Sequence, residues 1–105
     1  MRKQATYQGD DLTLICYNLC HIDGHGDYEI FPDHPLNLNL FELVERFKEL
    51  GYDMQGFNEK ICLMKQGRME ITAFPEGRII IEQLVPDDEN LAIAMVADFI
   101  GARLL

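Results

Sequence analysis

The chain has 105 residues, 48% of them hydrophobic, which is the size of one domain with one core. Asp and Glu outnumber Lys and Arg by 18 to 9, and the resulting formal net charge of −9 repels nucleic-acid phosphates and the anionic membrane leaflet. We therefore expect no nucleic-acid partner and no membrane partner. Three cysteines, an odd number, and the lack of a signal-like apolar run near the first residue predict reduced thiols in the cytoplasm.

The N-terminal part predicts a flexible segment followed by a β-hairpin. Residues 1–11 are polar with little periodicity, so we expect a flexible N-terminus and then a single α+β domain over residues 12–105. In residues 12–17, apolar residues alternate with residues of mixed polarity, which is typical of a strand. Residues 28–31 form a second short strand-like run. The Asp23-Gly24 pair between these runs favours a turn, so we expect the two runs to pair.

A helix is predicted after the proline-containing spacer of residues 32–35. Asn39 provides an N-cap, and Glu42, three residues later, completes a capping box. Gly51 stands where a left-handed residue would end this helix. Glu42 also lies four residues before Arg46, which predicts an ion pair on the helix surface. The apolar stripe of the helix consists of Leu40, Leu43, Val44, Phe47 and Leu50.

The best-defined feature of the sequence is a hairpin within residues 69–85. Pro75 presets the backbone φ and Gly77 adopts positive φ at no steric cost, which favours a tight turn between two β-rich runs. We expect Arg78 to form an ion pair across the hairpin, with one of two glutamates, Glu76 or Glu82. The turn itself reads Phe74-Pro75-Glu76-Gly77-Arg78.

The complete element order predicts the fold class. A strand over residues 60–65 precedes the hairpin, and a second helix follows Pro86, capped by the acidic residues 87–89 and ended by Gly101. The order is two short strands, a helix, about four strands and a helix. It predicts an α+β fold in which an antiparallel sheet of about four to six strands carries both helices on one face.

The hairpin and the second helix resemble a known module. The segments Phe74-Pro75-Glu76-Gly77-Arg78-Ile79-Ile80-Ile81 and Phe99-Ile100-Gly101 are similar to the small C-terminal module of the ubiquitin-activating-like adenylyltransferases ThiF, MoeB and HesA. These enzymes activate sulfur-carrier proteins in thiamine and molybdopterin biosynthesis. Upstream features follow the same order as in the module, namely Cys20, the helix ending at Gly51 and Asn58 before an apolar strand. The helix, four-strand, helix order also resembles half of a TATA-binding protein repeat, which implies a similar fold.

The chain departs from these adenylyltransferases where their chemistry resides. It has no Gly-x-Gly-x-x-Gly loop and no pair of Cys-x-x-Cys motifs, and it has Cys20-His21-Ile22 where the module usually has Cys-Gly-Arg. The resemblance therefore implies a non-catalytic accessory or protein-interaction module related to sulfur-carrier activation, with an adenylyltransferase or a sulfur-carrier protein as partner. An exposed sheet edge favours a homodimer. No trio of acid, base and orienting group is visible, so we expect no catalysis and no cofactor.

One segment supports an alternative function, that of a small thiol- or metal-binding protein. Four candidate ligands for zinc or iron lie close together in the sequence, namely Cys16, Cys20, His21 and His25. Their spacing differs from the Cys-x-x-Cys of usual zinc sites and no second cluster could close the site, so a buried Cys16 with solvated turn histidines also explains the pattern. Cys20 is separately a candidate reactive thiol, because a neighbouring histidinium such as His21 lowers a thiol pKa.

Overall fold

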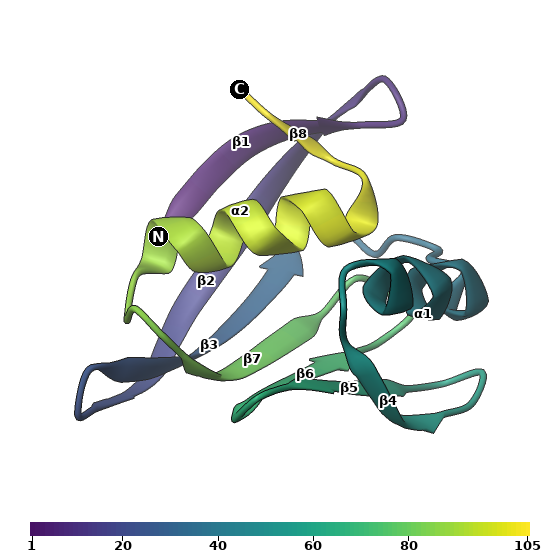
Figure 1. Cartoon of the computed structure of the whole chain (residues 1–105). Coiled ribbons are helices and arrows are strands. Elements are labelled where there is room, and N and C mark those ends of the chain that lie inside the picture. Colours follow the sequence, from purple (N-terminus) through teal and green to yellow (C-terminus); the bar gives the residue numbers. More distant parts are fainter.

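The computed structural model describes residues 1–105 and has an α+β fold, as the sequence predicts. A single antiparallel sheet has the strand order β4-β5-β6-β7-β3-β2-β1-β8 (Figure 1). The strands are β1 (Arg2–Tyr7), β2 (Asp10–Ile22), β3 (His25–Pro32), β4 (Asp53–Phe57), β5 (Cys62–Gln66), β6 (Met69–Ala73), β7 (Ile79–Leu84) and β8 (Arg103–Leu104). The helices are α1 (Leu40–Glu49) and α2 (Glu89–Ile100), and neither helix is long and apolar enough to cross a membrane.

The sheet has eight strands, so the expectation of four to six strands was wrong. The additional strands come from the two ends of the chain. The segment 1–11, which we expected to be flexible, forms β1 and the start of β2, and these pair from Arg2 opposite Ile15 to Tyr7 opposite Asp10. Among the side chains of β1 only Ala5 is buried. Backbone hydrogen bonds thus hold this strand in the sheet. Because almost none of its side chains enter the core, its sequence shows no alternation of apolar and polar residues.

Both helices begin and end at the predicted residues. The Asn39 side chain accepts hydrogen bonds from the backbone N–H groups of Phe41 and Glu42, at 3.0 and 3.3 Å, and Gly51 has a φ of 88° just after α1. Asp88 caps α2 in the same way, and Gly101 ends that helix with a φ of 78°. The predicted N-caps and helix ends are therefore confirmed, because these signals depend only on neighbouring residues. The capping box is not completed, because the Glu42 side chain makes no hydrogen bond to the Asn39 N–H.

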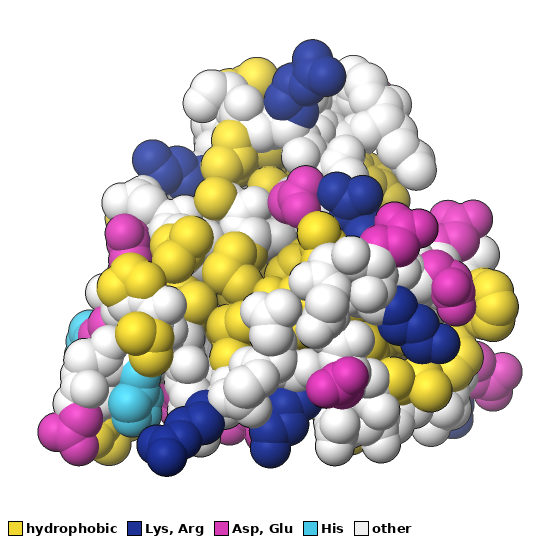
Figure 2. Space-filling view, viewed as in Figure 1, with side chains coloured by type: hydrophobic (Ala, Val, Ile, Leu, Met, Phe, Trp, Pro, Cys, Tyr) yellow, Lys and Arg dark blue, Asp and Glu magenta, His cyan; other side chains and the backbone are white.

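The two helices lie on the same face of the sheet, as predicted (Figure 1). One hydrophobic core fills the space between the helices and this face. Seen from the helix side, apolar side chains gather over α2, whereas acidic side chains lie around α1 (Figure 2). The largest fully buried side chains of the core include Leu12, Leu14, Cys16, Tyr28, Ile30, Phe47, Met64, Ile71, Ile79, Ile81, Ile93 and Val96.

The predicted turn between β6 and β7 forms, and it also supports the segment that leads to α1. The Phe74 N–H donates to the Arg78 carbonyl at 2.9 Å, and Gly77 has a φ of 107°. The carbonyls of Pro75 and Glu76 accept hydrogen bonds of 2.8 Å from the N–H groups of Leu38 and Leu36. The turn residues Pro75, Glu76, Gly77 and Arg78 thus determine how the chain enters α1.

Arg78 does not form the predicted ion pair with Glu76 or Glu82. Its guanidinium lies over the Phe74 ring, 4.2 Å from the ring centroid. A guanidinium stacks well on an aromatic face because it is planar and weakly hydrated.

Candidate functional site

A β-bulge lies just before the candidate thiol Cys20 and its neighbour His21. The pairing of β2 with β3 shifts between Asn18 and Cys20, so that Cys20 is opposite Asp27 and His21 is opposite Gly26. Successive side chains of a strand point to opposite faces of the sheet. His21 therefore shares the helix-bearing face with the buried Gly26, and the half-buried Cys20 points to the other face.

His21 instead contacts an aspartate in the loop before α2. Its Nδ1 atom lies 2.7 Å from Oδ2 of Asp87, and the hydroxyl of Tyr28 donates a hydrogen bond to the other carboxylate oxygen. These two hydrogen bonds, the one from Tyr28 first, hold the pKa of Asp87 below its ordinary value. Burial, and then the bond to Asp87, raise the pKa of Tyr28. Asp87 thus fastens the β2–β3 hairpin to the start of α2, whereas we expected it to contribute to the helix cap.

The structure does not bring the four candidate metal ligands together. Cys16 is buried in the core, where burial and then Glu89 raise its thiol pKa to about 11. His25 is paired with Ile22 next to the turn, one ladder position beyond the pair of His21 with Gly26. No group of three or more His, Cys, Asp or Glu side chains is placed to hold a metal ion.

The face of the sheet opposite the helices is uncovered and carries large apolar side chains. Directly opposite residues of an antiparallel pair share a face. The registers therefore place a continuous row across five strands of this face, namely Tyr17, Glu29, Ile80, Thr72 and Leu63. Tyr17 is 57% exposed and Leu63 is 37% exposed, and the Tyr17 ring packs against Phe31 with centroids 5.5 Å apart. We call this surface the open face.

Acidic side chains lie within the row of the open face, at Glu29, and beside it. Carboxylates outnumber the basic groups, which are Arg2, Lys65, Arg78 and Arg103. A hollow of about 290 Å³ at one end of the face is lined by Phe31, Pro32, Pro35, Arg78 and four further polar or acidic residues. The acidic residues of the face are Asp11, Asp27, Glu29, Asp53, Glu70 and Glu82.

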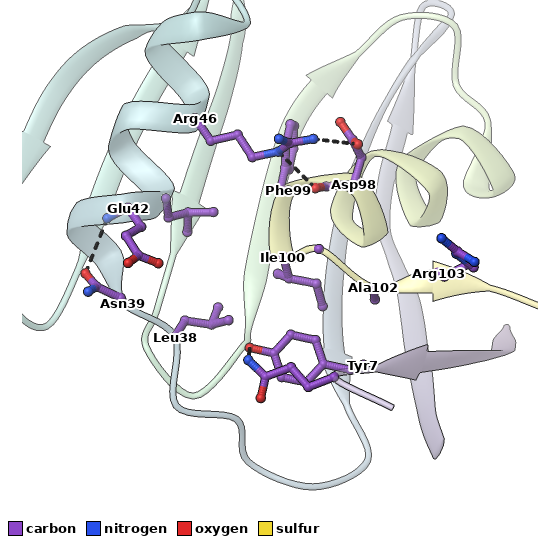
Figure 3. A pocket seen from close by; sticks show the side chains of 13 residues that line it. Tyr7, Leu38, Asn39, Glu42, Arg46, Asp98, Phe99, Ile100, Ala102 and Arg103 are labelled. Carbon is purple, nitrogen blue, oxygen red and sulfur yellow. Dashed lines mark hydrogen bonds and ion pairs between the residues drawn. The ribbon is translucent and has the colours of Figure 1, made fainter. Parts of the chain in front are cut away.

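A second and larger hollow lies on the helix side, between the start of α1 and the end of α2 (Figure 3). It has a volume of about 450 Å³. Arg46 of α1 reaches across to α2, where it donates to the Asp98 carboxylate at 2.8 Å and to the Asp98 carbonyl at 3.1 Å. The predicted pair of Arg46 with Glu42 is therefore not formed. We call this hollow the interhelical groove.

The sequence did not indicate the interhelical groove, because its lining residues are far apart in the chain. Arg46 and Asp98 are separated by 52 positions. The open face did have a sequence signal, since Tyr17 alternates with the buried Cys16 and is nevertheless large and aromatic.

Comparison with protein-family profiles, with characterised proteins and with solved structures finds no match to this chain.

Proposed function

We propose that the protein is a non-catalytic protein-interaction module that binds its partner across the open face. The observation that carries this proposal is the exposed row of the open face that begins at Tyr17 and ends at Leu63, with nothing in the chain packed over it. Antiparallel sheets with one solvated face usually place polar residues on that face. A face that exposes Tyr17 and Leu63, with Phe31 packed against the Tyr17 ring, is the kind of surface that marks an interface.

The chemistry of the open face defines the partner. Its rim is acidic, and the whole chain has a net charge of −9. A complementary surface carries apolar side chains for the Tyr17 and Phe31 rings, and Lys or Arg for the carboxylates of Glu29 and Glu82. Opposite charges at the rim accelerate association, and the buried aromatic side chains supply most of the affinity.

The order of strands and helices supports a more specific proposal about the identity of the partner protein. From β3 to α2 the order is strand, helix, four strands and helix, and β3 returns to lie beside β7. This order is compatible with a TATA-binding-protein-like half repeat and with the adenylyltransferase module that the hairpin resembles. We therefore propose an accessory role in sulfur-carrier activation, with the carrier or its adenylyltransferase as the partner protein.

Co-purification with matched variants tests the proposal. Tyr17→Lys places a charge at the exposed aromatic position of the open face, and Ala94→Lys places the same charge on the exposed side of α2. We expect a partner to co-purify with the wild type and with Ala94→Lys, but not with Tyr17→Lys. The identified partner, once purified, should bind Tyr17→Lys about 30-fold more weakly than wild type, since loss of a central aromatic contact costs about 2 kcal/mol. Equal binding by both variants would contradict the proposal.

A further inference from the structure

The second half of β2 has no neighbouring strand on one of its two sides. β1 pairs with β2 only as far as Arg2 opposite Ile15, and Met1 then exchanges backbone hydrogen bonds of 2.8 and 3.0 Å with Cys16. Residues 17–22 continue as a strand beyond this point and pair with β3 alone. Figure 1 shows the β2–β3 hairpin extending past the start of β1. We call residues 17–22 the free edge of β2.

The free edge combines large exposed apolar side chains with a lack of charge. Tyr17, Leu19 and Ile22 are 57%, 54% and 53% exposed. Residues 12–22 contain no Asp, Glu, Lys or Arg, and they form the longest such run in the chain. An exposed apolar strand edge without charged residues is a template for pairing with another strand.

The other edges of the sheet carry charged side chains. The two-residue strand β8, which includes Arg103, covers part of β1, and the uncovered part of β1 carries Arg2 and Lys3. At the opposite end of the sheet, the edge strand β4 begins at Asp53. Charged side chains on an edge oppose pairing, because a second strand would remove them from water. The free edge of β2 has no such protection.

From this arrangement we propose that the free edge of β2 pairs antiparallel with the free edge of a second copy of the chain, so that two sheets join into one. The charge distribution favours a second copy. Two chains of net charge −9 repel each other, so they associate most readily where carboxylates are absent or compensated. Asp87, which lies beside the free edge on the helix side, is already bound by Tyr28 and His21. The resulting interface is isologous, as in most homodimers.

This pairing places Cys20 near the two-fold axis of the dimer. Cys20 lies in the middle of residues 18–22, the part of the free edge farthest from the Met1–Cys16 pair. Beyond the bulge, Cys20 and the two residues after it pair regularly with β3, so the strand continues to the turn. Directly opposite residues of antiparallel strands have Cβ atoms about 4.5–5.5 Å apart. The Cys20 thiols of the two copies therefore lie within reach of a short crosslinker.

Sedimentation equilibrium of the purified, reduced chain tests the pairing. Between about 5 and 300 µM, we expect the wild type to pass from monomer to dimer. Leu19→Lys places a charge on the free edge, and Met54→Lys places the same charge at an exposed apolar position of the other edge strand, β4. The dissociation constant of the dimer should rise about tenfold or more in Leu19→Lys, because each dimer contains the substitution twice, and should not change in Met54→Lys. A wild type that stays monomeric, or equal weakening by both substitutions, would overturn the proposal.

Crosslinking with a short bismaleimide locates the interface without changing the free edge. Cys20 is the one cysteine that is not buried. We expect the wild type to give a covalent dimer of twice the chain mass, and Cys20→Ser to give none. A dimer in sedimentation that yields no crosslink through Cys20 would place the interface elsewhere and would also overturn the proposal. Both experiments use the purified chain alone, so their outcome does not depend on whether a partner protein binds the open face.

Discussion

The Asp87 carboxylate occupies the position that a Cβ atom on Gly26 would take. This close approach lets one carboxylate bind both the Tyr28 hydroxyl and His21 Nδ1. Asp87, which lies 61 positions further along the chain and just before α2, therefore requires a glycine at position 26.

Substitution of Gly26 by Ala should destabilise the fold. The new methyl group would displace the Asp87 carboxylate and would also lie 2.9 Å from the Tyr28 ring. We expect a loss of about 1–3 kcal/mol in the free energy of unfolding, measured by urea denaturation. Gly56→Ala is the matched control, because its Cβ would make only an ordinary contact of 3.4 Å with Leu63. Equal losses in both variants would contradict the steric explanation.

The lowered pKa of Asp87 predicts a pH dependence of stability. Because the folded state holds this pKa below the ordinary 3.8, the stabilising contribution of the ionised carboxylate is complete above that pH and is lost as the pH falls through the folded value. Wild type should therefore exceed Asp87→Asn in stability at about pH 5, and the difference should shrink toward about pH 3. Urea denaturation at several pH values measures this difference. A difference that stays constant over the range would exclude Asp87 as the titrating group.

Gly77 should tolerate alanine less well than another glycine of positive φ. Gly77 has a φ of 107° and its Cβ would lie 2.9 Å from Pro32, whereas Gly67 has a φ of 60° and open space around it. We expect Gly77→Ala to cost about 2–4 kcal/mol, from backbone strain and overpacking together, and Gly67→Ala to cost about 1 kcal/mol, from strain alone. Thermal or urea unfolding compares the two variants. A smaller loss of unfolding free energy in Gly77→Ala than in Gly67→Ala would contradict the close packing of this turn against Pro32.

Of the three thiols, Cys20 should react first in the native protein. Cys16 and Cys62 are buried, and burial is the main reason that their thiol pKa values rise to about 11. Iodoacetamide at about pH 8 should therefore add one group to the native chain and three to the urea-unfolded chain, as counted by mass spectrometry. Cys20→Ser should remain unmodified while folded. Rapid modification of Cys16 or Cys62 would show that the core is more open than the structure indicates.

The helices and the central hairpin could be predicted because their signals are local. Asn39, Asp88 and Gly101 act on backbone groups of their own helix ends, and the apolar stripe of α1 depends only on its spacing. The turn at Gly77 likewise depends on one proline and one glycine. Such signals do not change with the fold around them.

The parts that could not be predicted depend on long-range partners. Glu42 and Arg46 have the spacing of an ion pair, but folding brings Asp98 to Arg46 with both a carboxylate and a backbone carbonyl to accept its hydrogen bonds. The bulge before Cys20 has no sequence signal, although it decides that His21 rather than Cys20 faces Asp87. The polar strand β1 is held by its backbone, so its side chains did not reveal it.

Photo-crosslinking from the open face tests the central claim most directly. A benzophenone amino acid at position 17 lies on the open face, at the position of its most exposed aromatic side chain, and the same group at position 94 lies on the exposed side of α2. In cells that express each variant, we expect position 17, and not position 94, to crosslink a protein, which mass spectrometry then identifies. A second copy of the chain captured at position 17 would identify the partner as a homodimer subunit. Crosslinks from position 94 alone, or from neither position, would contradict a partner-binding open face.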